Sequence, residues 1–248
     1  MDLKRIVKNI RCFRNEPPIL VGLQNEITRL DWLEASLKKI PLGSRILDAG
    51  AGELAQKKYC AHLNYVSQDF GKYDGYGNCK GLQMSRWDNS KLDIISDITS
   101  IPQPDASFDA VMCIEVFEHL PEPICAIKEF SRLLKKNGTL ILTSPFCSLT
   151  HFAPYHFYSG FNKYFYEKHL PENGFEICEI SPNGNYFDYL AQELRRISTV
   201  ASTYGGYKNV KLNSLIEKLL PLLQQMSEMG KASSELLCFG YNIRAKRI

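Results

Sequence analysis

The chain has 248 residues, of which 44% are hydrophobic and 23% are charged, and its formal net charge is +3 at pH 7. This length suits one large α/β domain, or one domain with a small addition, and the composition is that of a globular protein. The mild positive charge does not call for a polyanionic partner, so nucleic-acid binding is not indicated.

The eight cysteines are scattered, and no two of them form a C-x-x-C pair. Several, such as Cys113 and Cys238, stand in apolar strand-like contexts. We interpret them as reduced core thiols rather than as a disulfide framework or a zinc site. The first residues lack the apolar stretch of a signal peptide, and no apolar run reaches the roughly 20 residues that span a bilayer. We therefore expect a soluble cytoplasmic protein without a membrane span.

The N-terminal part predicts a helical segment over residues 1–40. Residues 1–14 are basic, and residues 22–40 show helical spacing of apolar side chains that Pro41 and Gly43 bring to an end. A basic stretch of this kind is more often a solvated helix face than an RNA-binding arm. Residues 41–248 are expected to form the main domain.

Strand-like and helical runs alternate after residue 43. The clearest helix is Glu122–Lys136, which Asn137-Gly138 should close as a left-handed cap. Alternation with short connections predicts a parallel sheet that helices cover on both faces. The strands are expected near Arg45–Ala49, Tyr65–Asp69, Leu92–Asp97, Phe108–Ile114 and Thr139–Ser144.

Two segments interrupt this alternation. Gly71–Ser90 is rich in Gly, Tyr and Asn, and this composition predicts a long functional loop. A helical insert follows over about residues 187–233, and its second half, Leu212–Met229, is amphipathic and expected to break at Pro221. Its apolar stripe either packs within the chain or forms a homodimer contact. The apolar run Leu236–Ile243 reads as a last strand.

The most informative stretch is the run from Arg45 to Gly52. It predicts a buried strand, an acidic residue, a tight glycine turn and a following helix, which together bring bare backbone N–H groups and a helix N-terminus to a ligand. Asp69 follows Asp48 after twenty-one positions and marks a nucleoside pocket at the ends of two neighbouring strands. The glycines loosely satisfy a dinucleotide fingerprint. Asp48, however, suits a cationic or amino-bearing group better than a pyrophosphate.

Further motifs follow in order over about residues 40–147. They are Asp97-Ile98, Ile101-Pro102, Ser107-Phe108-Asp109-Ala110-Val111, Glu115-Val116-Phe117-Glu118-His119-Leu120-Pro121, Arg132-Leu133-Leu134-Lys135 and Gly138-Thr139-Leu140-Ile141-Leu142. In this order and spacing the segment resembles the type-11 branch of class I S-adenosylmethionine-dependent methyltransferases. The resemblance implies an α/β fold with a doubly wound, seven-stranded, mainly parallel sheet whose last strand is antiparallel. It also implies S-adenosylmethionine as the cofactor.

The resemblance assigns cofactor-binding roles residue by residue. Asp48, Gly50 and Gly52 correspond to the turn on the methionine side, and Asp69 to the residue that accepts hydrogen bonds from the ribose. Asp97 and Ile98 correspond to the adenine contacts, while Cys113 and Glu115 pass beside the methionine part. Leu54 stands where the family has a third glycine, which puts the shape of this turn in doubt.

Methylation of a hydroxyl group usually needs a general base or a metal ion. Two clusters contain suitable side chains: Glu115, Glu118 and His119 form the first, and the segment His151–Tyr158 is the second. We expect His119 or His156 to be the base. Some methyltransferases with an E-x-x-E-H pattern bind a divalent metal, and the corresponding residues here are Glu115, Glu118 and His119, with His156 or His151 completing the set. We do not expect a metal, because E-H-L is common in the type-11 branch without one.

The acceptor side is indicated by the aromatic segment His151–Tyr158, which follows the fifth strand. Aromatic faces with polar tips suit a sugar-like or ring-bearing small molecule. Together with Glu118-His119-Leu120-Pro121 and the run from Tyr73 to Gly77, this segment looks similar to bacterial methyltransferases that modify surface polysaccharide precursors. That resemblance implies a sugar- or nucleotide-linked acceptor in capsule biosynthesis, methylated on a sugar hydroxyl or on a phosphate-linked group such as a phosphoramidate. The alternatives are an RNA or protein methyltransferase, a nicotinamide oxidoreductase and a cofactor-binding pseudoenzyme.

Overall fold

The computed structural model describes residues 18–207 and 210–248, in two compact units. One unit comprises Ile27–Asn183 and Cys238–Ile248, and the other comprises residues 18–26 and Gly184–Leu237. The basic stretch over residues 1–14 lies outside the described residues. The division into a segment over 1–40 and a domain over 41–248 stays a prediction.

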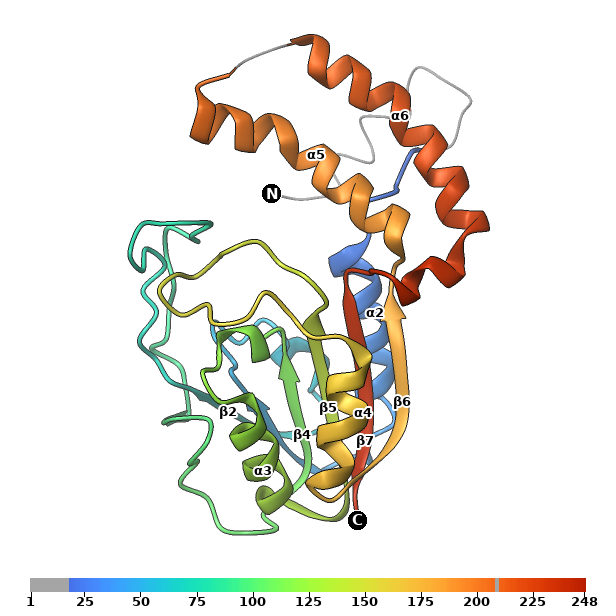
Figure 1. Ribbon diagram of the computed structural model, residues 1–248. Helices are drawn as coiled ribbons and strands as arrows, with labels where there is room; N and C mark the ends of the chain where they lie inside the picture. The colour runs from blue at the N-terminus through green and yellow to red at the C-terminus, as the bar shows by residue number, and fades with distance from the viewer. Residues whose placement is uncertain (1–17, 208–209) are drawn as a thin grey trace. The chain divides into compact units, whose positions relative to one another are not determined.

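The first unit contains a single sheet of seven strands in the order β3-β2-β1-β4-β5-β7-β6 (Figure 1). β1 to β5 run parallel, and β7 is antiparallel to both β5 and β6. This confirms the predicted mainly parallel sheet with an antiparallel last strand. The strands are β1 (Arg45–Ala49), β2 (Asn64–Asp69), β3 (Ile94–Ile95), β4 (Phe108–Ile114), β5 (Leu134–Pro145), β6 (Phe175–Asn183) and β7 (Gly240–Arg247).

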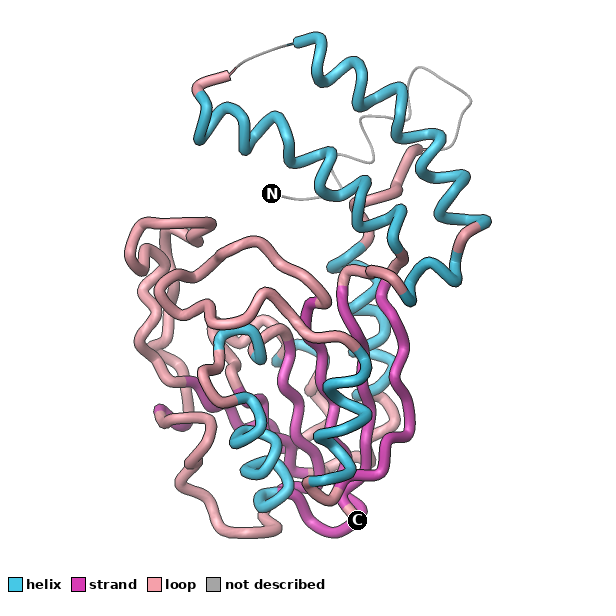
Figure 2. The backbone as a smooth tube through the Cα atoms, in the orientation of Figure 1, coloured by secondary structure: helices cyan, strands magenta, loops and turns pink. Residues whose placement is uncertain are grey.

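Helices cover both faces of this sheet, as the alternating pattern predicts (Figure 2). Helices α3 (Pro123–Leu133) and α4 (Lys163–Glu172) pack on one face, and α2 (Asn25–Leu37) packs on the other through its buried leucines. The central strand β4 is buried along nearly its whole length, because its alternate side chains enter the cores on opposite faces.

Two expected helical features of the unit that contains the sheet are wrong. No α-helix follows the glycine turn, where the chain forms turns and one short 3₁₀ helix, Lys57–Tyr59. Leu54 has a φ of +62°, which interrupts any right-handed helix that starts at the turn. Asn137 does take the left-handed conformation, with a φ of +64°, but α3 has already ended at Leu133 and Asn137 lies within β5.

The third and last strands differ from their expected bounds. β3 has only two residues, because Asp93, at its entrance, uses its side chain to accept hydrogen bonds from the Ser67 amide and hydroxyl of β2 at 2.8 and 2.7 Å. These bonds replace backbone pairing at that point. The last strand begins at Gly240, four residues after the expected start at Leu236.

The second unit is helical, with α5 (Tyr186–Gly205), α6 (Val210–Met229) and a short 3₁₀ helix, Lys231–Glu235. Asn185 caps α5 in a capping box with Asp188. Pro221 does not break α6, contrary to expectation; Glu217, four residues earlier, is exposed, so water can satisfy the carbonyl that proline leaves unpaired.

The apolar stripe of α6 is only partly used in packing. Ile216, Leu220 and Leu223 are buried in the core of the helical unit, whereas Leu215 remains 64% exposed and Leu219 41% exposed. Within the described residues, no helix has the length and apolar character that crossing a membrane requires.

Candidate active site

The candidate site lies at the carboxyl ends of β1, β2 and β4. The chain passes from β1 to β2 on one side, and β4 pairs with β1 on the other, so the ends of β1 and β4 flank a topological switch point. Gly50 follows β1 with a φ of +80°, and a Cβ atom there would lie 2.5 Å from the Val116 side chain. The glycine therefore lets the turn after β1 lie against the residues that follow β4.

Asp69 holds the glycine turn and the loop after β2 together. Its Oδ2 accepts a hydrogen bond from the Gly52 N–H at 3.0 Å, and its Oδ1 accepts one from the Gly71 N–H at 2.9 Å. The structure thus joins two of the predicted cofactor-binding residues, Gly52 and Asp69, in one contact.

The expectation that the glycine turn presents bare N–H groups to a ligand is wrong. The N–H groups of Gly50 and Ala51 both donate to the Gln68 carbonyl at 2.8 Å, and that of Gly52 is taken by Asp69. With no helix after the turn, this edge offers carboxylates to a ligand rather than a helix N-terminus. Leu54 adopts a left-handed conformation, which glycine takes up more readily than leucine.

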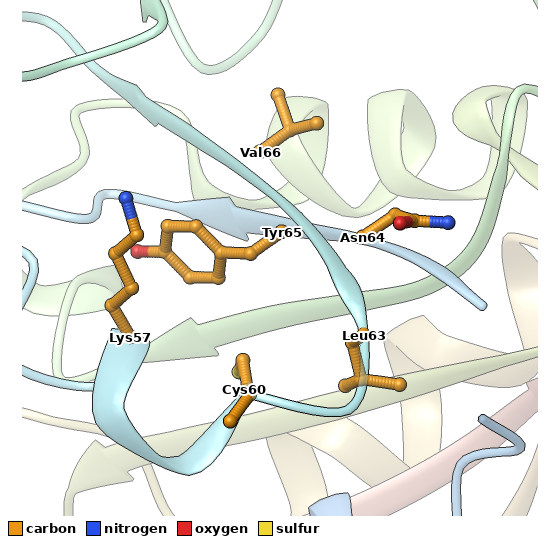
Figure 3. Close-up of a pocket in the computed structure, with 7 residues that line it drawn as sticks. Lys57, Cys60, Leu63, Asn64, Tyr65 and Val66 are labelled. Carbon is orange, nitrogen blue, oxygen red and sulfur yellow. The ribbon is translucent and has the colours of Figure 1, made fainter. Parts of the chain in front are cut away.

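Asp48 is a buried carboxylate at the end of β1, only 3% exposed. The Tyr65 hydroxyl donates to its Oδ2 at 2.5 Å. Burial raises the pKa of Asp48 to about 7, the Tyr65 hydrogen bond opposes this, and the charge of Asp69 adds to it. The Tyr65 ring also lines the pocket in Figure 3, which lies around the start of β2 and not at the strand ends that form the candidate site.

The raised pKa of Asp48 predicts that the free protein loses stability as the pH rises. The folded chain binds more protons than the unfolded chain between pH about 4 and 7, so the free energy of unfolding falls there by up to about 1.4 kcal/mol per pH unit. Asp48→Asn removes this titration. The free energy of unfolding, measured with urea, is the quantity to compare. The difference between the variant and the wild type should be about 2–3 kcal/mol larger in favour of the variant at pH 8 than at pH 5. Asp105→Asn, which changes an exposed side chain, is the control. If the stability of Asp48→Asn fell with rising pH as steeply as that of the wild type, the prediction would be wrong.

Asp97 and Ile98 lie in a turn after β3. Asp97 Oδ1 accepts hydrogen bonds from the Thr99 N–H and hydroxyl at 2.8 and 2.7 Å, and these bonds lower the pKa of Asp97. Ile98 is buried in the core on the α3 side of the sheet. Their adenine-binding roles stay predictions.

The end of β4 brings carboxylates together around Cys113. This thiol is fully buried, and its pKa is raised by burial and then by the charges of Asp48, Glu118, Asp69 and Glu115. Glu115 follows with a φ of +55°; its Oε1 accepts a hydrogen bond from the Thr143 hydroxyl at 2.9 Å, and its Oε2 pairs with Arg29 at 3.2 Å. The sequence analysis did not place Arg29 or Tyr65 in the site.

Three histidines and Glu118 gather beyond β4. Glu118 Oε1 lies 3.7 Å from His119 Nε2 and 3.8 Å from His151 Nε2. The His156 ring centroid is 4.8 Å from that of His151 and 5.9 Å from that of His119, and its Nε2 lies 3.2 Å from the Ser148 hydroxyl. Burial lowers the pKa of His119 to about 3 and also lowers the pKa of His156, so both rings are neutral at pH 7.

The predicted long loop Gly71–Ser90 does lack helices and extended strands, and it pairs with the aromatic segment. Leu82 forms a parallel bridge with His151, and the Tyr73 ring stacks on Phe152 at 4.5 Å. Phe152 stacks in turn on His119 at 5.1 Å. A Cβ atom on Gly52 would lie 2.6 Å from the Trp87 ring, so this loop also reaches the glycine turn.

Comparison with known proteins finds similarity over the middle of this chain. Residues 47–142 match the family model described as "Methyltransferase domain". A ubiquinone biosynthesis O-methyltransferase of Xanthomonas oryzae is 31% identical over 119 residues, 47% of this chain and 48% of the relative. One from Xylella fastidiosa is 28% identical over 121 residues, 47% of each chain. The chain thus spans about half the length of the curated relatives it matches.

Solved structures of low sequence identity share the fold. A SAM-dependent methyltransferase from Archaeoglobus fulgidus superimposes with a TM-score of 0.55 at 16% identity, covering 99% of this chain and 100% of that one. The [4+2]-cyclase SpnF has a TM-score of 0.55 at 17% identity, covering 94% and 84%. Residues 47–142 are therefore similar to a methyltransferase domain, and the seven-stranded sheet has the fold of these solved structures.

Proposed function

We propose that this chain transfers the methyl group of S-adenosylmethionine to an oxygen atom of a small-molecule acceptor. One observation carries the proposal: the glycine turn and Asp69 are joined at the switch point of the sheet, inside the segment that matches the methyltransferase domain. Transfer to oxygen is favoured by the names of the curated relatives.

The residues of the site fit this cofactor. Asp48 is buried, and the charged neighbour that shifts its pKa is another carboxylate, Asp69. A positively charged group bound beside Asp48 would compensate this charge, and S-adenosylmethionine carries both an amino group and a sulfonium. Each oxygen of Asp69 accepts one backbone hydrogen bond and keeps a lone pair for a ribose hydroxyl. When bound, the cofactor supplies an already activated methyl group.

Because the donor is activated, the chain has mainly to orient the acceptor and remove its proton. We assign the base to His156. His119 is less suited, since its Nδ1 is bonded to the Tyr155 carbonyl, its Nε2 faces Glu118, and burial lowers its pKa to about 3. A base is most effective when its pKa lies near the working pH.

For the acceptor we propose a ring-bearing hydroxyl compound. The stacked rings of Tyr73, Phe152 and His119 supply flat faces beside the acceptor-side histidines. The sugar or phosphoramidate of a capsule precursor has no support from the relatives, whose names refer to ubiquinone biosynthesis. The family match ends at residue 142, before the aromatic segment.

The reaction can be tested with methyl-labelled S-adenosylmethionine. The purified chain is incubated with the labelled cofactor and, separately, with a small-molecule extract, total RNA and denatured protein. We expect label only in the small-molecule fraction, as an alkali-stable methyl ether identified by mass spectrometry. Label in RNA or protein would favour the alternative acceptors, and label on nitrogen or carbon would contradict transfer to oxygen.

A further inference from the structure

Three ligand atoms converge on one point beyond β4. Glu118 Oε1, His119 Nε2 and His151 Nε2 all lie within 4.8 Å of one another, and the carboxylate oxygen is 3.7 and 3.8 Å from the two nitrogens. A tetrahedral ion with bonds of about 2.0–2.1 Å holds its ligand atoms about 3.4 Å apart. Modest side-chain movements would therefore bring all three atoms into one coordination shell.

Both imidazole rings are oriented for this by backbone carbonyls. His119 Nδ1 lies 2.5 Å from the Tyr155 oxygen, and His151 Nδ1 lies 2.8 Å from the Leu149 oxygen. A carbonyl oxygen only accepts hydrogen bonds, so each Nδ1 carries a proton, and in its neutral form each ring has its lone pair on Nε2, the atom that faces Glu118. Carbonyl partners of this kind orient metal-binding histidines.

Glu118 gives an independent reason to expect a cation. Its side chain is 2% exposed, and its Oε2 has no hydrogen-bond partner in the part of the chain that the structure describes. A buried carboxylate oxygen without a partner costs free energy that a bound cation would offset. Glu115, which the sequence analysis placed in the metal set, is instead engaged by Arg29 and Thr143.

We propose that Glu118, His119 and His151 bind one divalent transition-metal ion. Two imidazoles and one carboxylate suit Zn²⁺ and its first-row neighbours better than Mg²⁺ or Ca²⁺, which prefer oxygen ligands. An ion bound here would lie next to His156. It could bind the acceptor's hydroxyl oxygen and lower the pKa of that hydroxyl. This catalytic role of the ion rests on the proposed function. Binding of the ion itself requires neither the cofactor nor an acceptor.

The test is a titration of the tag-free, full-length chain with Co²⁺, followed by Zn²⁺. We expect one Co²⁺ per chain, a visible spectrum of nitrogen and oxygen ligation without a thiolate charge-transfer band, and displacement by Zn²⁺. The thiolate band matters because the chain has eight cysteines. Absence of stoichiometric binding, or a thiolate band, would overturn the inference.

Variants locate the ion. Glu118→Gln and His151→Gln should each weaken Co²⁺ binding at least about tenfold. His169→Gln, which changes a histidine of α4 that pairs with Glu172, should leave it unchanged. Because Glu118 is buried, His151→Gln, at a side chain 24% exposed, serves where Glu118→Gln fails to fold, as judged by thermal melting. Unchanged affinity in His151→Gln would remove the proposed site.

S-adenosylmethionine binding is measured on the same samples. A chain that binds the cofactor but not Co²⁺ loses only the metal inference. A chain that binds Co²⁺ but not the cofactor loses only the proposed methyl transfer.

Discussion

Asp69→Asn should weaken S-adenosylmethionine binding about a hundredfold. The amide has one oxygen where the carboxylate has two, so one of the two ribose hydroxyls that Asp69 is proposed to hold loses its acceptor, and either Gly52 or Gly71 loses the acceptor that fixes the turn. Hydrogen bonds from ribose hydroxyls to a charged group contribute about 1.5–3 kcal/mol each, so the loss of one and the weakening of the other reduce the free energy of binding by about 3 kcal/mol. At about 1.4 kcal/mol per factor of ten, this is about two powers of ten in Kd.

Isothermal calorimetry at pH 7.5 measures this effect. Asp105→Asn is the matched control, because it makes the same chemical change just before β4, at the amino ends of the parallel strands, where Asp105 pairs with Arg132. The control should bind the cofactor like the wild type. If Asp69→Asn binds within threefold of the wild type, Asp69 does not organise the pocket.

His156→Ala should lower kcat by a factor of about 10²–10⁴, the usual contribution of a positioned general base, and leave cofactor binding unchanged. His156 Nε2 lies 3.2 Å from the Ser148 hydroxyl, and the His156 ring centroid lies 4.8 Å from that of His151. Burial holds its pKa below the ordinary value of 6.5, so kcat of the wild type should be constant between pH 7 and pH 8.5 and should fall at acidic pH as the ring becomes protonated.

Single-turnover methyl transfer at saturating cofactor isolates this step from product release. Added imidazole should restore part of the rate in His156→Ala, a result that a merely structural role would not give. His169→Ala is the control, because it removes a histidine outside the site. Normal kcat in His156→Ala would make the assignment of the base wrong.

The sheet and the contact between Gly52 and Asp69 were predictable because they depend on local patterns. A run of buried apolar residues that ends in an acidic residue and two glycines is constrained by the sheet itself, and the spacing from Asp48 to Asp69 follows from two neighbouring strands. The antiparallel last strand came from the family resemblance, since its apolar run alone does not fix a direction.

The missed features depend on residues distant in sequence or on unusual backbone. A left-handed leucine at position 54 runs against conformational preference, so the helix expected after the turn was a reasonable but wrong prediction. Arg29 pairs with Glu115 across 86 positions. His151 reaches Glu118 from a segment that pairs with Leu82 of a loop, and no sequence periodicity encodes that pairing.

The measurement that tests the account most directly is a calorimetric titration of the wild-type chain with S-adenosylmethionine, and in parallel with NAD. We predict saturable binding of one S-adenosylmethionine per chain and no heat of binding from NAD. No affinity for S-adenosylmethionine, or a preference for NAD, would contradict the claim that this edge of the sheet holds a methyl donor.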